Sequence, residues 1–153
     1  MRKASFIAAM VSAPLLFSVS IAGAQQQSGT AAEAKAMLEK AVAAVKADEK
    51  AALEKFKKGE GGFKDRDLYV FCFDAESGKF TAHPNEKLMG TDVRALKDKS
   101  GDAMGEKIFK AGQTEQMTTV DYMFPKPGGT EPVAKQAFVA KVKDQGCGVG
   151  YYK

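Results

Sequence analysis

The sequence predicts an α+β domain in which a long N-terminal helix precedes a five-stranded antiparallel sheet, with short helices inserted between the second and third strands. Two observations indicate this class. Residues 30–58 are rich in Ala, Glu, Lys and Leu, with apolar residues at helical spacing. Residues 67–153 contain short apolar segments separated by turns that carry Gly and Pro. The length is that of a single domain with one core.

The N-terminus has the pattern of a cleavable secretion signal. Arg2 and Lys3 are followed by an apolar stretch over residues 6–21 and by the small-residue triplet Ala22-Gly23-Ala24, so cleavage is expected before residue 25. An uncleaved membrane anchor is the alternative, and it is disfavoured because serines and a proline interrupt the apolar stretch. We expect a signal peptide over 1–24, a flexible leader over 25–30 and one exported domain over 31–153.

A helix is predicted over residues 30–58. Thr30 and Glu33 form a capping-box pattern at its start, and Gly59 marks its end. The spacing fits either one long helix or two helices joined near Asp48. The apolar face must pack on another element, because tertiary burial supplies most of the stability of such a helix.

Residues 67–74 (DLYVFCFD) are typical of a strand that is apolar on both faces. Tyr69, Phe71 and Phe73 share one face, and three other apolar residues share the opposite face. Both faces of the sheet are therefore expected to be covered, and one side is free to hold a ligand cavity. Ser77-Gly78 marks a turn into a second strand over residues 79–83, which completes a hairpin.

The remaining elements follow from turn residues and periodicity. Short helical pieces are predicted over 92–97 and 102–111, and strands over 113–124 and 133–142. The last strand, 145–153, has glycines at positions 146, 148 and 150. These glycines indicate a close approach of other groups to the backbone. They do not indicate a phosphate cradle, because no helix follows them.

Charge and motifs exclude several function classes. Removing Arg2 and Lys3 lowers the net charge from +4 to +2 (4 minus 2), and Lys and Glu are interspersed, so no nucleic-acid partner is expected. No HExxH, GxSxG or phosphate-binding motif occurs, and His83 is the only histidine, so no enzymatic activity is expected. No cofactor and no metal site are predicted either.

The two cysteines, Cys72 and Cys147, both lie in the expected exported domain. An even pair outside the cytoplasm is compatible with a disulfide. It is equally compatible with two buried thiols that pack as small apolar side chains. Their spacing fits neither a metal site nor a CxxCH haem attachment.

Six segments together resemble one family. They are DLYVFCFD (67–74), AHP (82–84), LMGTDVRALKDKSG (88–101), VDYMFPKPG (120–128), PVAKQAFVAKV (132–142) and the terminal Gly-x-Gly-x-Tyr over 148–152. In order and spacing they are similar to the single Cache domains of type 2 (sCache_2). These are extracytoplasmic small-molecule sensor modules of bacterial receptors that also occur as free-standing exported proteins. The chain departs from the family pattern at Gln145, where a tryptophan is common, and at Phe138, where a tyrosine is frequent.

The resemblance implies a PAS-like fold, with the long helix on one face of the sheet and a ligand pocket on the other. It also implies that the first and last strands are neighbours, which favours a Cys72–Cys147 disulfide, and that the compartment is the periplasm. The ligand-binding residues it implies, with polar anchors at His83 and Lys135, are Tyr69, Phe71, His83, Tyr122, Lys135 and Phe138.

Four of these residues also have a purely structural interpretation. His83 precedes Pro84 and can cap a turn, or it can donate to or pair with an anionic ligand. Lys135 can point outward from its strand, or it can face the pocket, where a ligand carboxylate would supply its counter-charge. Tyr69 and Phe71 can be ordinary core residues, because aromatic strand residues usually are.

Two functions are consistent with the sequence. The first is a sensing module that binds a small organic acid or similar metabolite and presents the liganded state to a separate receptor or histidine kinase. The second is a ligand-free interaction domain whose long helix mediates homodimerisation. A cavity beside Tyr69, Tyr122 and Lys135 would favour the first function, and close packing of neighbouring side chains there would favour the second.

Overall fold

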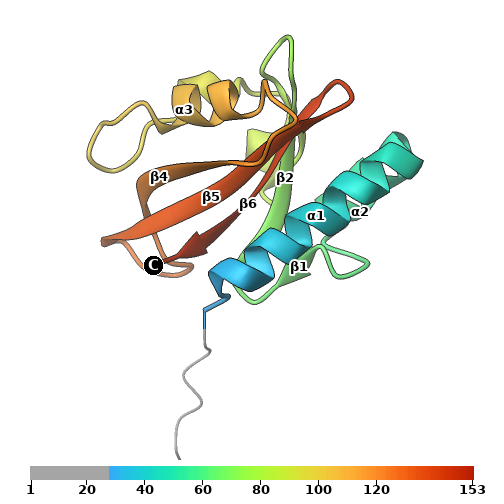
Figure 1. Ribbon diagram of the computed structural model, residues 1–153. Helices are drawn as coiled ribbons and strands as arrows, with labels where there is room; N and C mark the ends of the chain where they lie inside the picture. The colour runs from blue at the N-terminus through green and yellow to red at the C-terminus, as the bar shows by residue number, and fades with distance from the viewer. Residues whose placement is uncertain (1–27) are drawn as a thin grey trace, which may run out of the picture.

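Two consecutive helices, α1 (Ala31–Ala47) and α2 (Glu49–Lys58), lie along one face of an antiparallel sheet (Figure 1). The computed structural model describes residues 28–153, so the signal peptide predicted over 1–24 lies outside the described residues. Thr30 and Glu33 form the predicted capping box. Asp48 separates the two helices because its backbone is extended (φ −153°) and its side chain accepts the N–H of Ala51 at 3.0 Å. The two-helix form of the prediction is therefore the observed one.

The sheet has six strands in the order β1-β2-β6-β5-β4, and β3 also pairs with β2. The five predicted strands are present, although the third of them, β4, begins at Thr118 and not at residue 113. The additional strand β1 is not predicted, because two residues are too few to show an alternating pattern. The bounds are β1 (Lys64–Asp65), β2 (Leu68–Asp74), β3 (Phe80–Ala82), β4 (Thr118–Pro125), β5 (Pro132–Val142) and β6 (Gln145–Tyr152).

Hydrophobic clusters cover both faces of the sheet, as the apolar pattern of β2 predicts. Leu68, Val70 and Cys72 pack against α1 and α2. Phe71 and Phe73 point the other way, into a cluster completed by α3 (Met104–Ala111) and by the segment that precedes it. That segment contains the short 3-10 helices η1 (Glu86–Leu88) and η2 (Val93–Ala95). The layer order is α1/α2, sheet, α3, which is the PAS-like arrangement expected (Figure 1).

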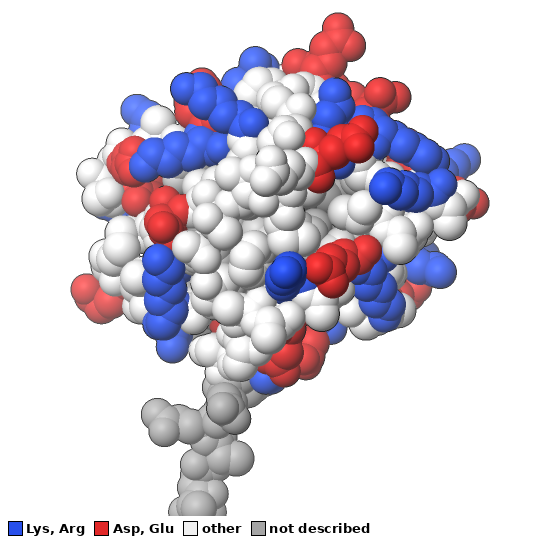
Figure 2. All heavy atoms as spheres, in the orientation of Figure 1, with Lys and Arg blue, Asp and Glu red and all other residues white. Residues whose placement is uncertain are grey.

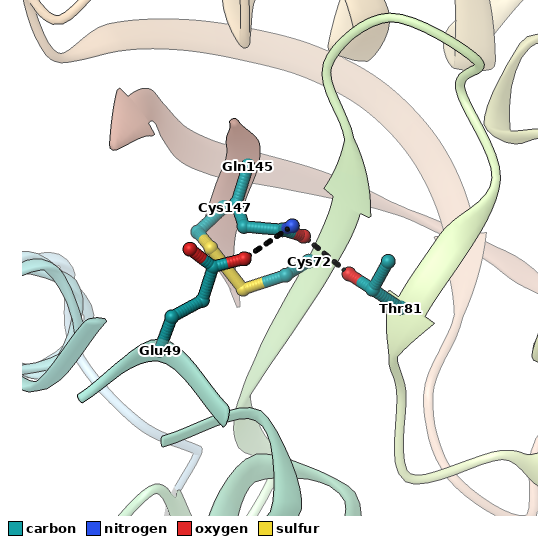
Figure 3. Close-up of a disulfide and its surroundings, with 5 residues drawn as sticks. All are labelled: Glu49, Cys72, Thr81, Gln145 and Cys147. Atoms are coloured by element: carbon teal, nitrogen blue, oxygen red, sulfur yellow. Dashed lines mark hydrogen bonds between the residues drawn. A yellow bond between two sulfur atoms is a disulfide. The ribbon is translucent and has the colours of Figure 1, made fainter. Parts of the chain in front are cut away.

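A disulfide joins Cys72 of β2 to Cys147 of β6, which face each other in the sheet. Both residues are fully buried on the side that α1 and α2 cover. Beside it, the Gln145 side chain donates to Glu49 Oε1 at 2.9 Å and accepts from Thr81 Oγ1 at 2.5 Å (Figure 3). The bond and this polar bridge therefore connect β2 and β6 with α2 and with the residue at the centre of β3.

Charged side chains of both signs are interspersed on the face of the molecule that Figure 2 shows. Neighbouring residues of opposite charge form ion pairs, such as Arg94 with Asp92 and Lys153 with Asp121. This distribution agrees with the interspersed Lys and Glu of the sequence. Within residues 28–153, no helix combines the length and the apolar character that crossing a bilayer requires.

Candidate ligand-binding site

A single buried lysine lies among aromatic rings at the end of the sheet where β6 finishes. Lys135 of β5 is only 2 % exposed. Its Nζ lies 4.6 Å from the ring centroid of Tyr152, 5.1 Å from that of Tyr69 and 5.5 Å from that of Phe124. The negative faces of aromatic rings attract an ammonium group, so this surrounding partly compensates for lost hydration. Below, "the Lys135 site" means Tyr69, His83, Tyr122, Phe124, Lys135 and Tyr152.

The register of three strands produces this cluster. Lys135 pairs with Tyr122 of β4 on one side and with Tyr152 of β6 on the other. Directly opposite residues of paired strands point to the same face of a sheet, so these three side chains gather on the face away from α1. Gly150 leaves the necessary room: a Cβ there would lie 2.8 Å from Tyr122 Oη and 2.9 Å from Lys135 Cε.

The ammonium of Lys135 has no anionic partner. Among residues 28–153, it makes no hydrogen bond and no ion pair, and the nearest influence of opposite sign is the charge of Asp67. Burial lowers the pKa of Lys135 from 10.5 to about 8, and the charge of Asp67 opposes that effect only in part. At pH 7 the side chain is a desolvated cation, a group that normally requires a counter-charge.

His83 occupies the edge of the site and also caps a turn. Its ring centroid lies 5.3 Å from that of Tyr69, and its Nδ1 accepts the N–H of Asn85 at 2.9 Å. Burial and the positive charge of Lys135 lower the pKa of His83 to about 4. The histidine is therefore neutral at pH 7, and since Nδ1 is an acceptor, Nε2 carries the proton. Of the two ligand roles expected for His83, this favours a donor over a charged partner.

The tyrosines of the site differ in how their hydroxyls are used. Tyr152 donates its hydroxyl to the carbonyl of Pro125 at 2.7 Å, and burial raises its pKa to about 12. Tyr69 and Tyr122 are half-buried, and desolvation raises both of their pKa values. Neither hydroxyl makes a hydrogen bond with the described residues, so two donors remain available close to the lysine.

Two of the predicted ligand residues lie elsewhere. Phe138 packs in the helix-side cluster, with its ring stacked on Tyr151 at 5.7 Å, so its predicted place beside Lys135 is wrong. The reason is strand alternation: residues 135 and 138 differ by an odd number and point to opposite faces. Phe71 is on the correct face, but it is buried core. Its ring lies over Gly148 and against Phe80.

One member of the Lys135 site, Tyr152, is not identified as a ligand-binding residue by the sequence argument. Phe124, at 36 % exposure, lies at the rim of the cluster, and Tyr152 forms one wall. A signal for Tyr152 exists in the sequence, because in an alternating strand it shares the face of Gly150.

A separate groove, open to solvent, lies between α3 and β4. Its lining contains no residue of the Lys135 site; it consists of Lys107, Lys110, Ala111, Thr114, Thr118, Thr119, Val120 and Asp121.

A family model described as Single Cache domain 2 matches residues 16–152. The chain belongs to the single Cache domain 2 family. The resemblance found in the sequence is thus confirmed, together with its fold. Cache domains of this family are sensing modules without catalytic activity of their own.

One receptor is similar to this Cache domain in sequence. It is the methyl-accepting chemotaxis protein McpP of Pseudomonas putida, which is 33% identical over 87 residues. The match covers 56% of this chain and 16% of the receptor. The Cache chain therefore matches only a small part of a much longer relative.

Three solved structures share the fold of this Cache domain. A methyl-accepting chemotaxis protein from Vibrio parahaemolyticus has a TM-score of 0.62 and 25% identity, covering 79% of this chain and 86% of that chain. The periplasmic sensor domain of a chemotaxis protein has a TM-score of 0.58 and 27% identity, covering 77% and 86%. A Cache chemosensory domain known for carboxylic acid recognition has a TM-score of 0.57 and 26% identity, covering 77% and 84%.

Proposed function

We propose that this protein is an extracytoplasmic sensor that binds a small organic acid at the Lys135 site, with the ligand carboxylate paired to the Lys135 ammonium. The observation that carries the proposal is a cation that is 2 % exposed and has no anionic partner among the described residues. Burying an unpaired charge costs several kcal/mol, and a protein that keeps one gains when an anion arrives.

The neighbouring groups suit a short carboxylate. The neutral His83 and the hydroxyls of Tyr69 and Tyr122 supply donors for the oxygens that Lys135 leaves unpaired. The rings of Tyr69, Phe124 and Tyr152 supply an apolar wall for a short carbon chain. Because the rings close around the ammonium, ligand entry requires the exposed Phe124 or the half-buried Tyr122 to rotate away.

The relatives support the compartment and the signalling role. They are chemotaxis receptors, a periplasmic sensor domain and a Cache domain that recognises carboxylic acids. We propose a periplasmic location, and transmission of the liganded state to a separate receptor or histidine kinase. We also propose that the protein forms a homodimer through helices α1 and α2.

A thermal-shift screen of the purified protein against carboxylates, amino acids and amines tests this function. A compound that binds only the folded state raises the unfolding midpoint in a concentration-dependent way. We expect such a rise with small carboxylates and none with amines, which would place a second cation beside Lys135. Absence of any shift in a well-folded sample would favour the ligand-free interaction domain, a function with which the closely packed rings also agree.

The affinity for a carboxylate should depend on pH above neutrality. A bound anion raises the pKa of Lys135 above its ligand-free value of about 8. The affinity is therefore highest below pH 8. It should fall about tenfold per pH unit above pH 8, until the pH reaches the pKa of Lys135 in the complex. Isothermal titration calorimetry from pH 6 to 10 measures this slope. An affinity that stays constant up to pH 10 would show that the Lys135 ammonium does not contact the ligand carboxylate.

Replacing Gly150 with Ala should weaken binding more than it weakens folding. The added Cβ meets Tyr122 Oη and Lys135 Cε, the far ends of long side chains that can move aside. We expect at least about tenfold weaker carboxylate binding and a loss of stability near 1 kcal/mol. Gly148→Ala is the matched control: its Cβ would lie 2.9 Å from the Phe138 carbonyl oxygen and 2.5 Å from the Phe71 ring. The Gly148→Ala variant should instead show a lower free energy of unfolding, which urea titration measures.

A further inference from the structure

One oxygen of Asp67 is buried without a partner. Asp67 directly precedes β2, and its Oδ1 accepts the backbone N–H of Gly29 at 2.6 Å. Its Oδ2 is inaccessible to solvent and has no hydrogen-bond partner within residues 28–153. Buried carboxylate oxygens normally have hydrogen-bond partners, because leaving one unpaired costs the full desolvation penalty of the charged group. The structural task of the side chain is already performed by Oδ1, so Oδ2 is left for another donor.

Asp67 lies at the same end of the sheet as the unpaired lysine, because it stands two residues before Tyr69, whose ring centroid is 5.1 Å from Lys135 Nζ. The charge of Asp67 acts on both Lys135 and Tyr152, and it raises the pKa of each. Asp67 and Lys135 nevertheless form no direct ion pair. The unpaired Lys135 ammonium of the site and the unpaired Oδ2 of Asp67 therefore lie at one end of the sheet without forming an ion pair. A molecule that satisfies both needs an anionic end and a donor end only a few atoms apart.

We infer that the Lys135 site takes a small zwitterion, an α-amino acid, with the carboxylate on Lys135 and the ammonium on Asp67. This inference rests on the proposed function and narrows its ligand class. A plain carboxylate satisfies Lys135 but leaves Asp67 Oδ2 unpaired and leaves the site with a net negative charge. A 2-oxo acid adds a further acceptor. A 2-hydroxy acid offers a neutral donor, whereas an ammonium also balances the charge of the site.

Four three-carbon acids of nearly equal size test the inference by calorimetry on the purified protein: alanine, lactate, pyruvate and propionate. We expect alanine to bind at least about tenfold more tightly than propionate, because one additional charge-assisted hydrogen bond strengthens binding by about that factor. Asp67→Asn should bring the ratio of the two affinities to about one while propionate binding persists. The Asn side chain retains an oxygen for the Gly29 N–H, so the local backbone contact is preserved. Asp65→Asn, on the exposed β1, is the matched control and should leave the ratio unchanged.

The outcomes are distinguishable from failure of the sensor function itself. Propionate or pyruvate binding as tightly as alanine would overturn the zwitterion and leave the carboxylate sensor intact. Lactate binding more tightly than alanine would also overturn it, because a neutral donor would then suffice. Binding of none of the four acids, with a folded protein, would remove both proposals. Persistence of the alanine preference in Asp67→Asn would show that another residue holds the ammonium.

Discussion

Lys135→Met is expected to abolish carboxylate binding and to stabilise the ligand-free protein. The substitution keeps an unbranched apolar side chain only one atom shorter, and it removes the charged Nζ that lies against the rings of Tyr69 and Tyr152. Losing one partner of a desolvated charge pair costs about 2–5 kcal/mol of binding energy, so affinity should fall at least about thirtyfold. Calorimetry or a thermal-shift titration with a carboxylate ligand measures the loss.

The gain in stability follows from the sign of the pKa shift. The pKa of Lys135 is about 8 in the folded protein against 10.5 for the free side chain, so the unfolded chain holds more protons between these values. The stability of the natural protein therefore rises as pH increases through that window and is lowest below pH 8. At pH 7 the penalty is at most about 3.5 kcal/mol, from about 1.4 kcal/mol per pKa unit. Lys135→Met should remove both the penalty and this pH dependence in urea titrations.

Lys141→Met is a suitable control for both measurements. Lys141 lies in the same strand, six residues on, and so points to the same face, but it pairs with Gly146 outside the Lys135 site. Neither carboxylate affinity nor the slope of stability between pH 8 and 10.5 should change in this variant. Unchanged affinity in Lys135→Met would contradict the role assigned to the lysine, whatever the stability shows.

Of the substitutions proposed for this protein, replacing both cysteines with alanine should cause the largest decrease in the free energy of unfolding. The disulfide joins residues separated by 75 positions, and in the chain-entropy model a loop of that size is worth about 4 kcal/mol. That amount is a large share of the stability of an ordinary domain. Both sulfur atoms are also buried against α1 and α2, so their removal loses packing as well.

Urea unfolding of the natural protein with and without dithiothreitol, and of the Cys72→Ala/Cys147→Ala variant, measures this contribution. The reductant should destabilise the natural protein to nearly the level of the variant and have no effect on the variant itself. Equal midpoints for the natural protein and the variant would show that the bond contributes little. Ligand binding should survive in the variant wherever it remains folded, because the bond lies on the face opposite to Lys135.

Most of the fold follows from local patterns in the sequence. The capping residues Thr30 and Glu33, the apolar face of residues 30–58 and the two-faced pattern of β2 each fix one element and the face that it buries. The choice between one helix and two depended on Asp48, whose side chain competes for the N–H of Ala51. The strand β1 could not be predicted, since two residues, Lys64 and Asp65, are too few to show an alternating pattern.

The candidate site was predictable only in part. Alternation and the family resemblance bring together Tyr69, Tyr122 and Lys135, and the structure gathers them with His83. The motif position of Phe138 predicts a pocket residue, but strand alternation places its side chain on the face opposite to Lys135. Asp67 could not be recognised, because an unpaired oxygen is a property of three-dimensional surroundings and not of residue type.

The position of β6 has a consequence for how the protein reaches its native state. This strand comes last along the domain, yet it lies between β2 and β5 and carries one half of the disulfide. Until residues 145–152 are available, the facing edges of β2 and β5 have no partner and the sheet cannot close. Completion of the fold therefore has to wait for residues 145–152, so the strand order keeps the sheet open while the C-terminal end of the domain is missing.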